Sequence, residues 1–274
     1  MKLPHNPIIT WVNNRIKKNK NVIMVINGGT GSGKTYAALE LAFEVSELNK
    51  TNFNVKDNVA FNVVDLLKHT MLPQNQKPGT CFVFEEVGAV GGGASSREWQ
   101  SKTNKFFFSF MQTTRHRNQI LIMTCPHFSF LEKGARSLVH MQMETQRINF
   151  EKGICYLKPF CIQVNSRTGM FYFKYLRVKY DGQRYKFNIW EAKLPPKDML
   201  DDYEVVKTKF TSALNKEIIR KEKPEYRVKS KIDKGKLKEL LDKKCSKKEI
   251  ARIFGCNVRT VFAMLKIMRE KGEL

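Results

Sequence analysis

The fold of this chain is decided by Val22-Ile23-Met24-Val25-Ile26-Asn27-Gly28-Gly29-Thr30-Gly31-Ser32-Gly33-Lys34-Thr35. Its first five residues are apolar and mostly β-branched, a pattern typical of a buried strand in a parallel sheet. Its last eight residues match the pattern G-x-x-x-x-G-K-[ST] without a departure. Apolar side chains at helical spacing follow from Tyr36 to Leu48, which predicts a helix after the turn. Strand, glycine-rich turn and helix in this order predict a nucleotide-binding loop.

Each position of this loop has a physical task. Glycines allow the backbone angles and the close approach that turn successive N–H groups toward a phosphate. Lys34 is expected to reach the β- and γ-phosphates of ATP, and Thr35 to place its hydroxyl on Mg²⁺. The helix that follows presents its positive N-terminus to the same anion. The residues predicted to bind the nucleotide are Gly28, Gly29, Thr30, Gly31, Ser32, Gly33, Lys34, Thr35 and Tyr36.

A second motif lies about 50 residues further along the chain. Four apolar residues, Cys81 to Phe84, predict a buried strand, and Glu85 and Glu86 follow it directly. In this arrangement the first acid helps to hold Mg²⁺ and the second polarises the attacking water. Aspartate is the usual residue at the first position, so Glu85 is a departure. ATP and Mg²⁺ are therefore the predicted cofactors, with Lys34 and Glu86 as catalytic residues.

A further strand, Ile120 to Met123, ends in Thr124. An additional strand of this kind carries a γ-phosphate sensor in one class of P-loop ATPases, and Thr124 is the candidate here. A strand-end cap explains the same residue. Arg115 precedes this strand and is a candidate arginine finger for its own or a neighbouring subunit. A solvated or DNA-facing arginine is the competing interpretation.

Composition points to a polyanionic partner. The 274 residues carry a formal net charge of +23 with a pI near 9.8, a balance that fits nucleic acid or an anionic membrane surface. No apolar run reaches the roughly 18 residues of a membrane-spanning helix, and the N-terminus lacks the apolar region of a signal peptide. We therefore expect a soluble, intracellular, cytoplasmic protein. The six cysteines include no C-x-x-C pair and are expected to be buried thiols.

The predicted fold class is α/β: a P-loop NTPase with a mainly parallel RecA-like sheet, a β-hairpin extension and a small all-α helix-turn-helix domain. The expected parts are an ATPase core over residues 1–150, hairpins and a long helix over 151–225, a basic linker over 226–236, and the helical domain over 237–274. The Phe, Tyr, Lys and Arg residues of the hairpins could stack single-stranded nucleic acid. Two-sided packing of the strands explains the same mixture.

The C-terminal segment predicts a helix-turn-helix. Ser246-Lys247-Lys248-Glu249 is a capping box that opens a helix, and Gly255 stands where the turn needs glycine. The next helix would meet the major groove of DNA with residues at its start and one further along. These are Asn257, Val258, Arg259, Thr260 and Lys266. A helical protein-interaction module is the alternative. A DNA-binding module favours nucleic acid over a membrane as the polyanion.

Together these motifs resemble the HerA/FtsK superfamily of DNA-pumping ATPases, and most of all its Zot-like and packaging-type members from archaeal viruses and plasmids. The resemblance rests on Gly28 to Thr35, on Phe84-Glu85-Glu86, and on Thr114-Arg115-His116-Arg117 before the strand that ends at Thr124. It covers roughly residues 7–148. It implies a homo-hexameric ring that moves or segregates duplex DNA, with Glu86 activating water. Many members have glutamine where this chain has Thr124. The C-terminal segment separately resembles resolvase-type helix-turn-helix domains.

Three functions fit these features. The leading hypothesis is an ATP-driven DNA motor, or a partitioning or packaging ATPase, of a mobile element. The first alternative is an AAA+-like switch that loads a helicase, integrase or transposase on DNA. The second is a nucleotide-binding transcriptional regulator that does not hydrolyse ATP.

Overall fold

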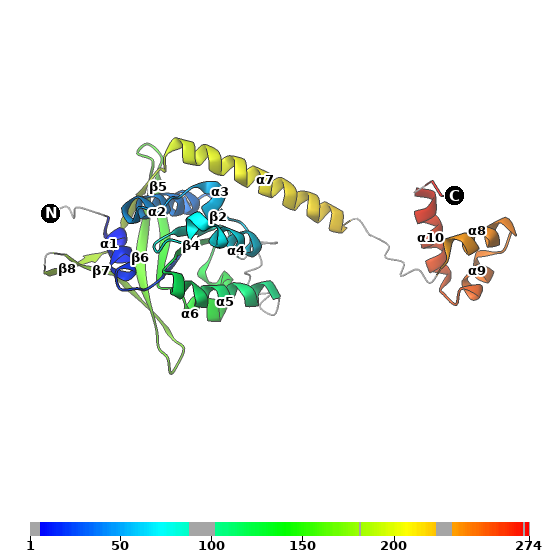
Figure 1. Ribbon diagram of the computed structural model, residues 1–274, viewed down its shortest axis with the longest axis horizontal. Coiled ribbons are helices and arrows are strands. Elements are labelled where there is room, and N and C mark those ends of the chain that lie inside the picture. The colour runs from blue at the N-terminus through cyan, green and yellow to red at the C-terminus, as the bar shows by residue number, and fades with distance from the viewer. Residues whose placement is uncertain (1–5, 88–101, 181, 223–231, 271, 274) are drawn as a thin grey trace. The chain divides into compact units, whose positions relative to one another are not determined.

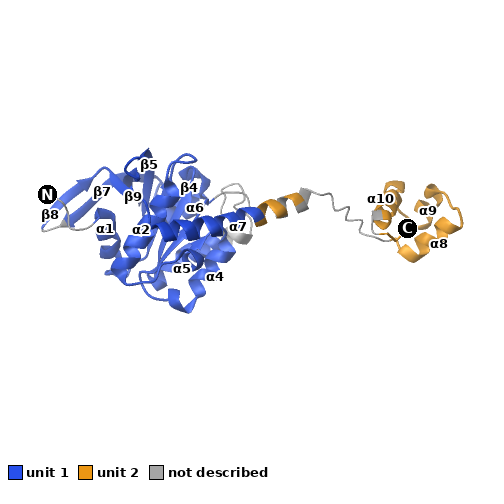
Figure 2. Ribbon diagram, turned by 90° about the horizontal axis from the view of Figure 1, so that it is seen from above, with its two compact units in different colours: residues 1–212 blue, residues 213–274 orange. Residues whose placement is uncertain are grey.

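The computed structural model describes residues 6–87, 102–180, 182–222, 232–270 and 272–273. It divides into two compact units, Met1–Ser212 and Ala213–Leu274, which are described separately (Figure 2). The expected linker over residues 226–236 lies largely outside the described residues. In the described part of the chain, no helix is both long enough and apolar enough to cross a membrane.

Five parallel strands form the centre of the first unit. They are β1 (Val22–Asn27), β2 (Val59–Ala60), β3 (Cys81–Phe84), β4 (Ile120–Cys125) and β5 (Met141–Asn149). Their order in the sheet is β2-β3-β4-β1-β5, so β4 is inserted between the two strands that carry the motifs. Asn27 of β1 stands in register with Cys125 of β4, which brings the carboxyl ends of these strands to one edge. The mainly parallel α/β sheet predicted from the sequence is confirmed.

Helices cover both faces of this sheet because successive strand residues point to opposite sides. Val22, Met24 and Ile26 of β1 face a core shared with α1 (Pro7–Ile16) and α2 (Lys34–Asn49). Ile23 and Val25 face a second core. The elements on that side are α4 (Val63–Met71), α5 (Lys102–Arg117), the 3-10 turn η3 (Phe128–Phe130) and α6 (Lys133–Ser137) (Figure 1). Two short segments lie in the connections at the β2 edge of the sheet. They are α3 (Val55–Asn58), which precedes β2, and η1 (Pro73–Asn75), which precedes β3.

The sheet continues beyond β5 with antiparallel strands. They are β6 (Ile154–Val164), β7 (Phe171–Tyr180), β8 (Gln183–Phe187) and β9 (Trp190–Lys193), and β9 returns to pair with β6. The long helix α7 (Lys197–Glu222) follows. The first compact unit therefore extends through these strands to Ser212, whereas the sequence analysis ended the core at residue 150. Hydrogen bonding between β5 and β6 is the reason, since it makes core and extension one sheet.

Besides the end of α7, the described part of the second unit contains three short helices with their own small core. They are α8 (Lys234–Asp242), α9 (Lys247–Ile253) and α10 (Val258–Glu270). Leu237, Ile250 and Val261 are buried against one another, one from each helix. Ser246 and Glu249 form both hydrogen bonds of the expected capping box, and Gly255 has φ +58° in the turn before α10. Recognition of DNA by these helices stays a prediction.

Candidate functional site

The glycine-rich loop connects β1 to α2, and two of its glycines are required by close packing. A side chain at Gly28 would collide with the hydroxyl of Thr145 on β5. Gly33 caps α2 with φ +83°, and a Cβ there would lie 3.0 Å from the Cys155 sulfur on β6. Larger residues at either position would displace the loop from the strands behind it.

Hydrogen bonds from β5 and β6 hold the loop in place. The Thr145 hydroxyl lies 2.9 Å from the Ser32 hydroxyl, and the Cys155 thiol donates to the Ser32 carbonyl at 3.4 Å. Lys34 donates from Nζ to the Gly29 carbonyl at 2.6 Å, so its ammonium group lies inside the loop. Burial lowers the pKa of Lys34, while the Glu86 carboxylate raises it. The loop thus presents a cation and backbone N–H groups in the arrangement that binds phosphates.

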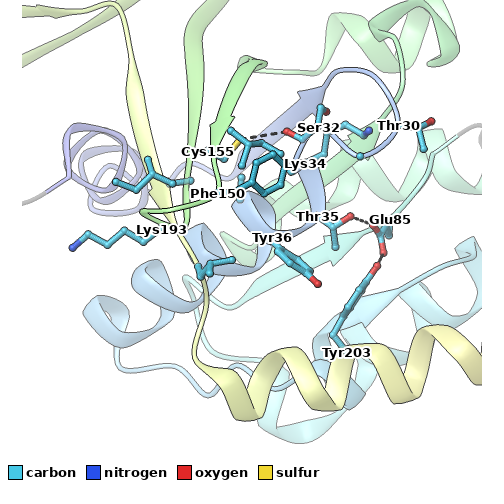
Figure 3. Close-up of a pocket in the computed structure, with 18 of the residues that line it drawn as sticks. Thr30, Ser32, Lys34, Thr35, Tyr36, Glu85, Phe150, Cys155, Lys193 and Tyr203 are labelled. Carbon is cyan, nitrogen blue, oxygen red and sulfur yellow. Dashed lines mark hydrogen bonds between the residues drawn. The ribbon is translucent and has the colours of Figure 1, made fainter.

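Glu85, directly after β3, meets the loop through its carboxylate. Its side chain is 1% exposed, and it accepts hydrogen bonds from the Thr35 hydroxyl and the Tyr203 hydroxyl (Figure 3). Lys207 Nζ lies 3.7 Å from the Glu85 carboxylate. Burial raises the pKa of Glu85, and the two hydrogen bonds and the Lys207 charge act against that rise.

The oxygens of Thr35 and Glu85 fit a magnesium ion. Mg²⁺ prefers oxygen ligands and usually takes only one or two from the protein, keeping waters and substrate phosphates for the rest. A hydroxyl and a carboxylate in direct contact beside the loop supply that number. The described residues contain no group of three or more His, Cys, Asp or Glu side chains suited to a metal.

Glu86 differs from its neighbour in being open to solvent, with 58% of its side chain exposed. Its backbone has φ +51°, a conformation that non-glycine residues adopt at a cost. The Glu86 N–H donates to the Thr124 hydroxyl at 2.9 Å, and this bond stabilises the turn. Lys207 Nζ lies 3.9 Å from the Glu86 carboxylate. An exposed acid beside a buried one matches the division of tasks expected for activating water and holding a metal.

These groups line one pocket of about 440 Å³ (Figure 3). Part of the lining is polar, with Lys34, Glu86 and Lys207. Another part comes from the β5–β6 turn and from the end of β9 and is mainly apolar, with one lysine. Its residues are Ile148, Phe150, Gly153, Ile154, Ala192, Lys193 and Leu194. Phe150 is 84% exposed, so its ring is available to a ligand. The polar part suits phosphates, and the mainly apolar part suits a nucleobase.

Most of the predicted loop residues lie on this pocket. Thr30, Gly31, Ser32, Gly33, Lys34, Thr35 and Tyr36 line it. Gly28 and Gly29 lie at the start of the loop, where Gly28 packs on Thr145 and the Gly29 carbonyl accepts from Lys34. Tyr36 donates from its hydroxyl to Glu204 of α7 at 3.4 Å. The contacts of all these residues with a nucleotide stay predictions.

Thr124 and Arg115 do not lie on this pocket. Thr124 is fully buried, and its hydroxyl accepts from the backbone N–H of Glu86. A role as γ-phosphate sensor and a role as strand-end cap both stay predictions. Arg115 lies near the end of α5, before the amino end of β4, and lines a different cavity. Six strand residues, about 20 Å, separate the two ends of β4. Because β4 runs from that end of the sheet to the nucleotide edge, Arg115 lies at the opposite edge from the loop of its own chain. Its role as an arginine finger stays a prediction.

Sequence reasoning missed Tyr203 and Lys207. Both come from α7, more than 110 residues beyond Glu85, and nothing local marks them within a long basic helix. It also missed the mainly apolar part of the pocket, including Phe150. The only local sign of this part of the pocket is Phe150 itself, an aromatic residue in the turn between two strands.

In the C-terminal unit, the residues predicted to contact DNA lie at the start of α10 and along it. Asn257, Arg259 and Lys266 are exposed, and Val258 and Thr260 are half-buried. The Asn257 side chain accepts from the Arg259 N–H at 2.9 Å. This helix end therefore presents polar and basic groups to solvent.

Comparison with known proteins gives distant similarities only. No family model matches the chain, and no curated protein matches it. Among solved structures, the N-terminal domain of zonular occludens toxin from Neisseria meningitidis is 17% identical. It covers 57% of this chain and 95% of its own, with a TM-score of 0.35. The genome packaging NTPase B204 from Sulfolobus turreted icosahedral virus 2, in complex with ATP-gammaS, is 10% identical. The match covers 56% of this chain and 96% of the packaging NTPase chain, with a TM-score of 0.36.

The same packaging NTPase in complex with sulfate is 8% identical, with a TM-score of 0.36. Similarity of this degree assigns no function to the chain. The function has to come from the residues of the pocket.

Proposed function

We propose that this chain hydrolyses ATP in the pocket above the glycine-rich loop and uses the energy to act on DNA. One observation carries the proposal: the Glu85 carboxylate contacts the Thr35 hydroxyl directly after the loop lysine, and the exposed Glu86 carboxylate stands next to it. A phosphate cradle, a metal-binding pair of oxygens and a general base are thereby gathered in one place.

The residues divide the work as follows. Loop N–H groups and the Lys34 ammonium bind the phosphates and stabilise charge that develops on the transferred phosphoryl group. Thr35 and Glu85 would hold Mg²⁺, which when bound neutralises phosphate charge. Glu86 orients a water molecule and accepts its proton through the exposed carboxylate. Thr124 keeps Glu86 at its place through the backbone N–H.

The base would lie at the mainly apolar part of the pocket. Phe150 offers an exposed ring, and Ile148 and Leu194 provide aliphatic contact. Stacking and apolar contact bind a purine without selecting it through polar groups. We therefore expect a purine nucleotide to bind with its base against this part of the pocket.

DNA as the partner is supported by the net charge of +23 and by the exposed basic residues of α10. Within this proposal the chain acts as a HerA/FtsK-like motor, or as a packaging or partitioning ATPase of a mobile element, assembled as a ring of about six copies. Arg115, remote from its own pocket, would serve a neighbouring subunit. The AAA+-like switch and the nucleotide-binding regulator are the alternatives.

Hydrolysis is tested by comparing wild-type protein with Lys34→Ala and with the control Lys77→Ala, an exposed lysine far from the loop in sequence. We expect release of phosphate from ATP with Mg²⁺, stimulated by duplex DNA, in wild type and control. In Lys34→Ala the rate should fall about 100-fold or more, because a preorganised cation is lost from the site of developing charge. Full activity of Lys34→Ala would contradict the proposal.

Movement along DNA separates a motor from a switch. A motor displaces the third strand of a triplex placed on linear duplex in an ATP-dependent reaction. A loading switch hydrolyses ATP without displacing that strand. A regulator that only binds the nucleotide hydrolyses no ATP, with or without DNA.

A further inference from the structure

The ribbon of β7 and β8 carries an unusual arrangement of charge. Arg177 on β7 stands directly opposite Lys186 on β8, and Lys179 stands directly opposite Arg184. Residues directly opposite each other in an antiparallel pair share a face, and alternate residues of one strand do so as well. These four cations, named here the ribbon cations, therefore point to the same side of the ribbon. All four are exposed.

Like charges directly opposite each other destabilise a strand pair. The ribbon contains two such pairs in succession. Within the described residues, no carboxylate lies within 4.0 Å of any of the ribbon cations. Lys186 instead lies 4.6 Å above the Tyr175 ring. The repulsion within the two pairs destabilises the ribbon by itself. An anion that contacts both pairs would neutralise their positive charge.

The opposite face of the ribbon is already occupied. Leu176 and Val178 are buried in the core that contains Ile8 and Val12 of α1. Figure 1 shows β7 and β8 beside α1 at the end of the sheet. Packing is therefore one-sided at this end of β7, and the cationic side faces solvent. The sequence left two explanations for the aromatic and basic residues of the hairpins, packing of the strands and contact with nucleic acid. Packing explains the apolar face of this ribbon but not its cationic face.

We propose that the ribbon cations bind the phosphate backbone of nucleic acid, as a contact surface in addition to α10. The choice of nucleic acid as the polyanion rests on the proposed function. The charge pattern is observed in the structure and does not depend on that function. A two-stranded ribbon has the width that the major groove of duplex DNA admits. Tyr175, Arg177 and Lys186 also line a surface hollow of about 460 Å³.

The test uses the full chain without nucleotide and the double variant Arg177→Gln/Lys186→Gln. The matched control is Lys18→Gln/Lys77→Gln, which removes the same charge from exposed positions elsewhere. Probes are a fluorescent 30-base-pair duplex, its single strand, and vesicles containing phosphatidylserine. Affinity is measured across a series of salt concentrations.

For the ribbon variant we expect weaker binding to nucleic acid, by roughly 10-fold or more at 0.1 M salt. The slope of log affinity against log salt should become shallower by about 1.8 on duplex, since each phosphate contact contributes about 0.9. Its melting temperature should stay close to that of wild type, because loss of the Lys186–Tyr175 contact and removal of a repulsive pair act in opposite directions. A surface that only supports folding would not show weaker binding together with unchanged stability.

Three results would overturn the inference: an unchanged slope, an equal loss in the control variant, or a loss confined to the vesicles. The last would assign the surface to a membrane. Failure of the proposed function is separate, because it is seen as absence of ATP hydrolysis in wild type, whereas this assay needs no ATP. Arg259→Gln measures the contribution of α10 in the same assay.

Discussion

The pocket has two sides that arise in different ways. On one side, the glycine-rich loop and Glu85 follow directly from two strands whose carboxyl ends lie at one edge of the sheet. On the other side, α7 brings Tyr203 and Lys207 to the same carboxylates from a distant part of the chain. The first side is built by local order along the chain, and the second by the packing of a helix.

This difference has a functional consequence. The loop side holds the groups that any phosphate-cleaving site of this kind needs, and their loss should abolish turnover. The α7 side places a hydroxyl and a cation beside the Glu85 and Glu86 carboxylates, to which we assign the metal and the water in the proposed function. Changes on the α7 side should therefore alter the rate without removing it.

Glu86→Gln should have the largest effect, on the loop side. The amide cannot accept the proton of the attacking water, so kcat for ATP should fall about 100-fold or more. The Kd for ATPγS should stay within about threefold of wild type, because the amide keeps the shape of the side chain. Titration of ATPγS together with a steady-state phosphate assay measures both. Unchanged turnover would remove Glu86 from the mechanism, and absence of turnover in the wild type as well would favour the non-catalytic regulator.

Lys207→Met should come second. The variant removes a cation that lies within 4.0 Å of both the Glu85 and the Glu86 carboxylate. We expect kcat/KM to fall about 10-fold, well below the full Coulomb energy, because Lys207 is partly exposed. The control Lys209→Met removes an exposed charge from the same helix and should behave as wild type. An equal loss in both variants would attribute the effect to the charge of the helix as a whole.

Thr124→Val should have a smaller effect. It removes the acceptor of the Glu86 N–H and keeps the shape of the buried side chain. A lost hydrogen bond of about 1 kcal/mol corresponds to a decrease in kcat of roughly fivefold. Affinity for ATPγS should not change, and Thr124→Ser should restore the rate. A marked loss of ATPγS affinity with retained ADP affinity would instead make Thr124 the γ-phosphate sensor.

Tyr203→Phe should have the smallest effect at neutral pH, less than about threefold on kcat/KM. We expect its main effect on the pH dependence of kcat/KM. Burial raises the pKa of Glu85, and the Tyr203 hydrogen bond lowers it, so the phenylalanine variant has the higher Glu85 pKa. Activity needs the ionised carboxylate and is lost as pH falls through that pKa. The acid limb of the kcat/KM profile should therefore move to higher pH; an unmoved limb would show that Tyr203 does not tune Glu85.

Much of the pocket could be predicted from the sequence because its signals are local. Val22 to Thr35 combine a β-branched run with glycines that no other residue type replaces at Gly28 and Gly33. The capping box at Ser246 likewise predicts the start of α9 from four consecutive residues. Arg115 shows the limit: its distance from the pocket depends on the direction of β4, which nearness in sequence does not convey.

The sequence by itself therefore determined the parallel α/β core, the loop and its carboxylates, because strand period, glycine geometry and residue order are properties of short segments. The tertiary structure alone decided that α7 covers those carboxylates, that Phe150 completes the pocket, and that the ribbon cations share one open face. These relations depend on which distant elements pack together and in which register. Burial and strand pairing set them after the local elements form, and so no short segment encodes them.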